Sequence, residues 1–230
     1  MEARQEKLLR QIIKTYVATA EPVGSLFLAQ KSNKKLSSAT IRNEMGDLEA
    51  GGYIYQPHTS AGRVPTEKGY KFYVEKFLKK DGRIDRVLSA KISCFIRDLK
   101  GEEKIKAAAR AAAELTEEAV IVAFNADRFY FTGLSYLFGK PEFTNQACVT
   151  TVSQVLDHCE EVLPGILELL GEEGSVLIGS DNPLGKLCSF LASPLQLRPT
   201  AGKGLFGILG PLRMDYERNQ TALKTIMSII

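Results

Sequence analysis

The sequence predicts an α+β protein that begins with a winged helix-turn-helix, continues through a helical connector and ends in an α/β domain. Up to about residue 80, three helical patterns precede two short β-prone segments and a fourth helix. Helical periodicity then dominates to about residue 118, and β-prone and helical segments alternate beyond it. We therefore expect domains at 1–80 and 119–230, joined by a connector at 81–118 that is a possible dimerisation element.

The first helix is indicated by apolar residues that recur every three to four positions between residues 2 and 19. Pro22 and Gly24 end it, because proline cannot continue a helix and glycine tolerates the turn. Ser25 is expected to cap a second helix that runs to about Lys31.

The third helix is capped by Ser37 or Ser38 and terminated by the glycine pair at 51–52. Two β-prone segments follow, at 53–56 and 63–65, with a turn-rich stretch between them. Thr66 then caps the fourth helix. Three helices and a β-hairpin can close one small core, as in a winged helix-turn-helix.

One face of the third helix has the composition of a DNA-reading surface. At one hundred degrees per residue, Ile41, Met45 and Leu48 cluster on the buried side. The opposite side carries small residues with one Asn and one Arg, and these can pair bidentately with adenine and guanine. The alternative is a surface helix whose glycine and alanines are incidental. The residues of the face are Ala39, Asn43, Gly46 and Ala50, flanked by Thr40, Arg42 and Asp47.

The hairpin tip is polar and either reaches DNA as a wing or is simply a solvated turn. Lysines nearby would add salt-dependent, sequence-independent affinity. The candidate DNA contacts are Ser37, Ser38, Thr40, Arg42 and Asn43 in the third helix; His58, Thr59, Ser60 and Arg63 in the hairpin; and Lys34, Lys35, Lys68 and Lys71.

Charge is divided unevenly along the chain. Residues 1–80 hold fourteen Lys and Arg against eight Asp and Glu, a net charge of +6, whereas the remaining residues carry −3. A basic N-terminal third favours a polyanion-binding module. The apolar runs are too short to span a membrane, and the charged N-terminus lacks a signal-peptide core, so we expect a cytoplasmic protein.

The C-terminal part mixes both kinds of element. An apolar stripe predicts a helix within 83–115, interrupted near Gly101. Strands are expected at 119–125, 128–136, 175–179, 189–197 and 205–209, with helices at 148–170 and 215–229.

Neither catalysis nor a metal or cofactor is expected. The two histidines have no nucleophile in a recognisable motif, and the four cysteines are scattered, so Cys94 and Cys159 are expected to pack in cores. Residues 202–207 fit the G-x-G-x-x-G pattern, but a β-prone segment follows them where the dinucleotide fingerprint needs a helix. We expect a hairpin turn there.

Six stretches of the chain form an ordered set of motifs. They are 20–25 (AEPVGS), 39–45 (ATIRNEM), 56–63 (QPHTSAGR), 65–70 (PTEKGY), 133–135 with 141–143 (PEF), and 207–216 (GILGPLRMDY). In this order they resemble the heat-inducible transcription repressors of the HrcA family. The resemblance implies a dimeric repressor with a winged helix and a GAF-like domain. Such a repressor binds an inverted-repeat operator upstream of chaperone operons and is kept active by the chaperonin.

The chain departs from the family pattern where an inserted dimerising domain is usual. Residues 115–118 lead through the strand at 120–124 almost directly into 129–136. The GAF-like domain is therefore reduced, and the apolar stripe at 84–99 or the α/β domain would have to supply the dimer interface.

Two functional hypotheses follow. In the first, the chain is a dimeric repressor of heat-shock (chaperone) genes with double-stranded operator DNA as its partner. In the second, the acidic α/β domain is a ligand- or protein-sensing surface, and the winged helix regulates a different set of genes.

Overall fold

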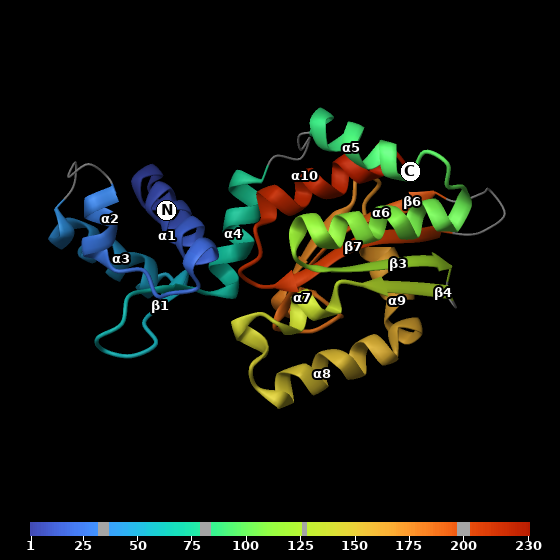
Figure 1. Ribbon diagram of the computed structural model, residues 1–230. Helices are drawn as coiled ribbons and strands as arrows, with labels where there is room; N and C mark the ends of the chain where they lie inside the picture. Colours follow the sequence, from blue (N-terminus) through green and yellow to red (C-terminus); the bar gives the residue numbers. More distant parts are fainter. Residues whose placement is uncertain (32–36, 79–83, 126–127, 197–202) are drawn as a thin grey trace. The chain divides into compact units, whose positions relative to one another are not determined.

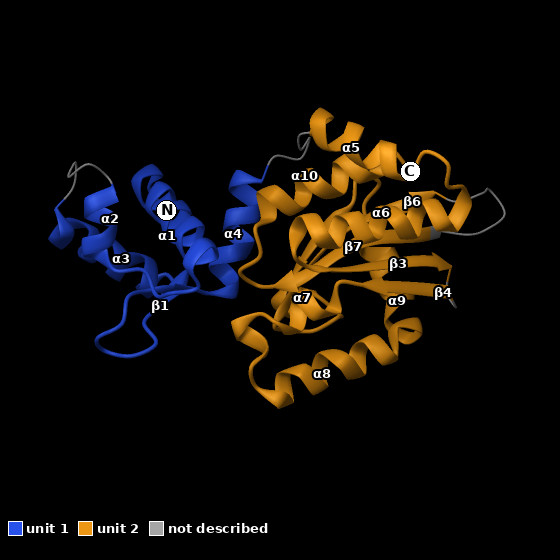
Figure 2. Ribbon diagram, viewed as in Figure 1, with its two compact units in different colours: residues 1–78 blue, residues 79–230 orange. Residues whose placement is uncertain are grey.

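The computed structural model describes residues 1–31, 37–78, 84–125, 128–196 and 203–230. The chain divides into two compact units, residues 1–78 and 79–230 (Figure 2).

Unit 1 has the predicted order of helices and hairpin, so it is winged helix-turn-helix-like (Figure 1). The hairpin strands pair antiparallel, with Ile54 opposite Pro65 and Tyr55 opposite Val64. The elements are α1 (Ala3–Thr19), α2 (Ser25–Lys31), α3 (Ser38–Ala50), β1 (Ile54–Tyr55), β2 (Val64–Pro65) and α4 (Glu67–Phe77).

The core of unit 1 is built on α1, which contacts α3, α4 and β2. Leu9, Ile12 and Ile13 of α1 are at most 1% exposed, and Ile41 and Leu48 of α3 are at most 2% exposed. Burial of such side chains contributes about 1.5–3 kcal/mol each. The buried stripe of α1 therefore fixes which side of α3 faces outward.

Residues between α1 and α2 close unit 1 by joining the hairpin. Val23 and Arg63 exchange two backbone hydrogen bonds, each of 2.9 Å. Ser25 is the first residue of α2 rather than its cap, and its hydroxyl instead lies 3.0 Å from that of Ser38. Farther along, a Cβ at Gly69 would lie 2.3 Å from the carbonyl oxygen of Tyr53, so only glycine lets α4 approach the hairpin this closely.

Unit 2 is a five-stranded antiparallel sheet with helices on both faces (Figure 1). The strand order is β4-β3-β7-β6-β5. The strands are β3 (Ala119–Asn125), β4 (Arg128–Thr132), β5 (Ser175–Ile178), β6 (Cys188–Gln196) and β7 (Lys203–Pro211). The helices are α5 (Arg86–Ile96), α6 (Gly101–Thr116), α7 (Leu134–Phe138), α8 (Gln146–Asp157), α9 (Cys159–Leu169) and α10 (Tyr216–Met227), with short 3₁₀ turns at Pro141–Phe143 and Gly179–Asp181.

Both faces of the sheet are covered, and successive side chains of β3, which point to opposite faces, are buried on each of them. Ile121 and Ala123 join the cluster that also contains Leu137 of α7, Leu156 of α8 and Ile166 of α9. The helices α6 and α10 contact each other; α6 also contacts β3, β4 and β7, and α10 contacts β6 and β7. Figure 1 shows both helices on the opposite side of the sheet from α8.

Two predicted elements of unit 2 have different bounds. The strand predicted at 128–136 ends at Thr132, because Gly133 has a positive φ of 75° and begins α7. The helix predicted at 148–170 is divided into α8 and α9 at His158, whose φ and ψ are −112° and 35°.

The helix α5 is apolar on two sides. Ile92 and Ile96 are buried, and the helix contacts α6 and α10. Phe95 is 84% exposed and Val87 is 67% exposed. The prediction that Cys94 packs in a core is wrong, since this thiol is exposed, whereas Cys159 is buried as expected.

Candidate nucleic-acid interface

The helix α3 presents the face that its periodicity predicts. Ile41, Met45 and Leu48 are at most 3% exposed, whereas Arg42 and Asn43 are exposed. Neither of these two side chains has a hydrogen bond or ion pair to any residue that the structure describes. Both are therefore available to a partner, and Arg and Asn can each make two parallel hydrogen bonds to a base edge.

The start of α3 is built by serine and threonine hydroxyls. Ser37 is the N-cap, and its Oγ accepts a hydrogen bond of 3.1 Å from the Thr40 backbone N–H. The Thr40 hydroxyl lies 2.8 Å from the same oxygen. Ser38 is paired with Ser25, so three of the candidate DNA contacts at this end also serve the local structure. Ser37 remains exposed and sits where free helix N–H groups favour a phosphate.

The hairpin tip is held in shape by one side chain that the sequence did not single out. Gln56 donates from Nε2 to the carbonyl oxygens of Thr59, at 2.9 Å, and Ala61, at 2.8 Å. His58 Nδ1 lies 3.1 Å from the Ser60 hydroxyl. These bonds hold the backbone of His58, Thr59 and Ser60 in a defined exposed loop.

Three of the cationic candidates are committed to neighbours within unit 1. Arg63 binds Glu49 of α3 through Nε and Nη2, each 3.0 Å from Glu49 Oε2. Lys68 donates to the Gly51 carbonyl at 2.7 Å and lies over the Tyr53 ring. Lys71 pairs with Glu67 one helical turn away. Lys34 and Lys35 lie outside the described residues.

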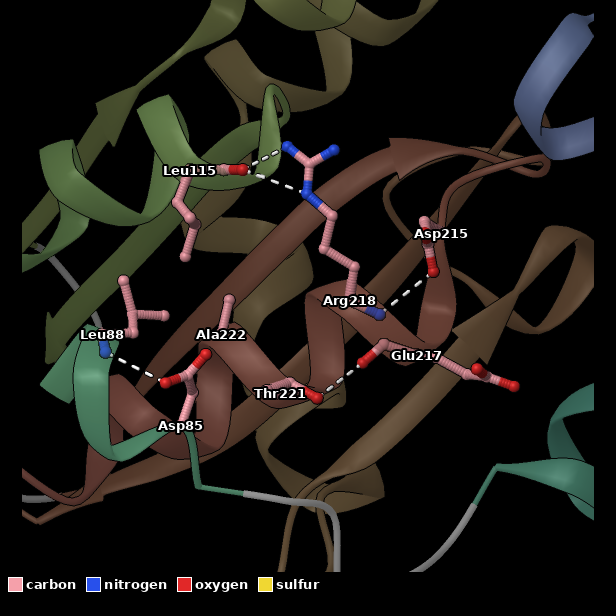
Figure 3. A pocket seen from close by; sticks show the side chains of 8 residues that line it. All are labelled: Asp85, Leu88, Leu115, Asp215, Glu217, Arg218, Thr221 and Ala222. Carbon is pink, nitrogen blue, oxygen red and sulfur yellow. Dashed lines mark hydrogen bonds between the residues drawn. The ribbon is translucent and has the colours of Figure 1, made fainter.

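In unit 2, a hollow of about 370 Å³ opens where α5, α6 and α10 meet (Figure 3). Three of its polar side chains hold the ends of these helices. Asp85 caps α5, Asp215 caps α10, and Arg218 donates to the Leu115 carbonyl at the end of α6. Leu88 and Ala222 line the rest. The bonds of Asp85, Asp215 and Arg218 in Figure 3 thus hold helix ends, whereas the Thr221 hydroxyl donates to the Glu217 carbonyl within α10.

A buried acid lies beneath the segment 210–216, at the junction of α6 and β3. Glu118 is 3% exposed, and its Oε1 lies 3.5 Å from Lys140 Nζ, while its Oε2 has no hydrogen-bond partner. Burial raises the pKa of Glu118 to about 7, although the charges of Lys140, Arg213 and Arg218 favour the ionised form. A Cβ at Gly210 would lie 2.7 Å from Oε2, so the glycine makes room for the carboxyl group.

Other residues of this segment have structural roles as well. Arg213 forms a two-pronged ion pair with Glu142. The Tyr216 hydroxyl donates to the Leu212 carbonyl and lies 2.7 Å from the Ser189 hydroxyl. These contacts explain the segment as a set of polar links between the end of β7, α10 and the 3₁₀ turn at 141–143.

Among the described residues, no group of three or more His, Cys, Asp or Glu side chains could hold a metal ion. Burial raises the pKa of the Cys159 thiol to about 11 and that of Cys188 to about 12, so both stay protonated at neutral pH. The literal G-x-G-x-x-G residues Gly204 and Gly207 lie within β7. In the same described ranges, no helix is both long and apolar enough to cross a membrane.

Comparison with known proteins gives a family match within unit 2 and curated relatives that match part of the chain. A family model described as the HrcA protein C terminal domain matches residues 82–219. The heat-inducible transcription repressor HrcA of Acetivibrio thermocellus is 57% identical over 79 residues, which cover 34% of this chain and 22% of that protein. Its counterpart from Natranaerobius thermophilus is 44% identical over 121 residues, which cover 52% of this chain and 35% of that protein. The matches thus span between about a fifth and about a third of these relatives' length.

A solved structure has the same fold. It is described as the crystal structure of a hypothetical protein at 2.2 Å resolution, and it superposes with a TM-score of 0.80 at 21% sequence identity. The superposition covers 99% of this chain and 97% of that chain.

The raised pKa of Glu118 predicts that the stability of the fold depends on pH. The folded state binds the proton of this carboxyl up to a pKa of about 7, whereas an exposed glutamate releases it near 4.5. The contribution of this group to stability is therefore greatest at low pH and is lost as the pH rises through 7. Glu118→Gln removes the group that ionises. The free energy of unfolding of this variant, minus that of the wild type, should therefore rise by about 2–3 kcal/mol from pH 5 to pH 8.

Thermal unfolding midpoints across that range measure the effect. Glu114→Gln, which changes an exposed residue of α6, is the matched control and should show no such slope. A stability difference for Glu118→Gln that does not change with pH would contradict the assignment.

Proposed function

Because the chain belongs to the HrcA family, we propose that it is a DNA-binding repressor of heat-shock (chaperone) genes. It binds an inverted-repeat operator as a dimer. The observation that carries this proposal is the outer face of α3, where exposed Arg42 and Asn43 lie on a helix whose opposite side is buried. Specific DNA readers of this class place such a helix in the major groove.

Each unit has its part in the proposal. Residues 1–80 form the DNA-binding domain, in which Ser37 and the hairpin loop from His58 to Ser60 contact the backbone that flanks the bases read by α3. Residues 119–230 form a reduced GAF-like domain. Residues 117–118 alone separate α6 from β3, which leaves no place there for an inserted dimerising domain.

Dimerisation is assigned to the connector at 81–118. An inverted repeat requires a two-fold partner, and the outer side of α5 offers Val87 and Phe95 as unburied apolar surface. Modulation by the chaperonin and a cytoplasmic location complete the proposal and rest on the family alone.

The ligand-sensing alternative has less support. Its candidate site would be the hollow of Figure 3, where Asp85, Asp215 and Arg218 hold helix ends. We therefore retain the repressor as the proposed function.

Base reading by α3 is tested by Asn43→Ala and Arg42→Ala. Each should weaken binding by about 1–3 kcal/mol and relax the preference at one base position per half-site. The probe is an operator duplex selected from a randomised library by the wild-type chain. Equal weakening on scrambled DNA would contradict the assigned role.

Close approach of α3 to the groove is tested at Gly46. A Cβ there would meet no atom within 4 Å, so nothing within unit 1 requires glycine at this helical position. Gly46→Ala should raise stability by about 0.5–1 kcal/mol through helix propensity, yet weaken operator binding by crowding the DNA.

The control for Gly46→Ala is Gly165→Ala, an exposed helical position in α9 that also has open space around its Cβ. It should gain comparable stability and bind DNA like the wild type. A Gly46→Ala variant with unchanged affinity would show that α3 does not lie close to the duplex.

The dimer is tested by light scattering. The wild type alone should have twice the chain mass of 25.3 kDa. With operator DNA, the complex should have the mass of two chains plus one duplex. Phe95→Glu should give a monomer, because it places a charge on the assigned interface, where Phe95 is 84% exposed. Leu169→Glu, at an equally apolar position on α9 that is 53% exposed, is the control and should leave the dimer intact. A wild type that is monomeric on DNA would contradict two-fold binding.

A further inference from the structure

The helix assigned to DNA reading carries more negative than positive charge. Between Ser38 and Ala50 there are three acids, Glu44, Asp47 and Glu49, and one cation, Arg42. DNA is a polyanion whose affinity for proteins comes largely from cationic contacts to phosphate. Three unscreened carboxylates on this helix would therefore oppose the proposed function.

Each of the three acids receives a donor from another part of unit 1. Glu49 takes both Nε and Nη2 of Arg63 on one oxygen, each at 3.0 Å. Glu44 forms an ion pair with Arg4 of α1. Asp47 accepts a hydrogen bond of 3.3 Å from Gln5, the next residue of α1.

The pair between Arg63 and Glu49 has the features of a fixed contact. The Arg63 side chain is 17% exposed and that of Glu49 is 34% exposed. The Arg63 backbone is held on both sides by its hydrogen bonds to Val23. The guanidinium extends from this anchored backbone to α3, so its charge is neutralised by the Glu49 carboxylate. The same contact fixes the hairpin against the helix.

We propose that Arg63 is a positioning residue that acts on DNA binding through Glu49, by cancelling its charge and holding α3 against the hairpin, rather than a contact to phosphate. Arg4 acts in the same way through Glu44. This inference rests on the proposed function and deepens it. It also gives two of the candidate cations different roles. Arg42 contacts bases, whereas Arg63 neutralises a carboxylate of α3 that would otherwise repel DNA.

A double-mutant cycle tests the proposal. The affinity for the selected operator duplex, and its dependence on salt concentration, are measured for the wild type, Arg63→Ala, Glu49→Ala and the double variant. Arg63→Ala exposes an unpaired carboxylate and should weaken binding by about tenfold or more. The double variant removes that carboxylate and should recover most of the loss, with the salt dependence of the wild type.

A phosphate contact would behave differently. Removing it lowers the slope of log affinity against log salt by about one, and no change at Glu49 compensates for it. Loss of that slope without recovery in the double variant would overturn the proposal. So would an Arg63→Ala variant that binds like the wild type.

The control is Lys76→Ala, which also removes one cation from an ion pair of unit 1. Its partner is Glu6 of α1, so no acid of α3 is exposed and affinity should change little. Thermal unfolding of each variant separates loss of fold from loss of binding. If Arg63→Ala does not fold, Arg4→Ala with Glu44→Gln gives the same cycle at the second pair. A wild-type chain that enriches no duplex from the library would refute the proposed function itself.

Discussion

Two backbone hydrogen bonds between Val23 and Arg63 are the constraint on which unit 1 depends. They join the turn after α1 to the hairpin, two segments far apart in sequence, without using any side chain. Once they form, the direction of the Arg63 side chain is set, and it reaches Glu49. The buried stripe of α1 and this bridge together leave α3 a single way to face outward.

Patterns between neighbouring residues predicted much of this structure. The faces of α3 follow from its helical period, and the hairpin and its flanking helices follow from turn and cap residues, so these were correct. The break at His158 was missed because the apolar period continues through Leu156, Cys159 and Leu163, all of which are buried in one cluster. The end of β4 was missed because β-prone residues continue beyond Gly133, and only its positive φ stops the strand.

The polar pairs could not be predicted because their members are distant in sequence. Arg63 was a candidate DNA contact in the sequence analysis, and its ion pair with Glu49 could not be predicted because the two residues are fourteen positions apart. Gln56 was overlooked because its acceptors are backbone carbonyls. The segment 210–216 was noticed through family resemblance, yet the resemblance says nothing of Glu118, the acid that Gly210 accommodates.

The position of β7 at the centre of the sheet sets an order of assembly. It pairs with β3 on one side and β6 on the other, and it follows both in the chain. During synthesis the sheet of unit 2 cannot close until residues 203–211 have left the ribosome, whereas all contacts within unit 1 join residues made earlier. A nascent chain thus contains all residues of unit 1 before the sheet of unit 2 can close. Any premature stop before β7 would leave unit 1 joined to an unfinished sheet with exposed strand edges.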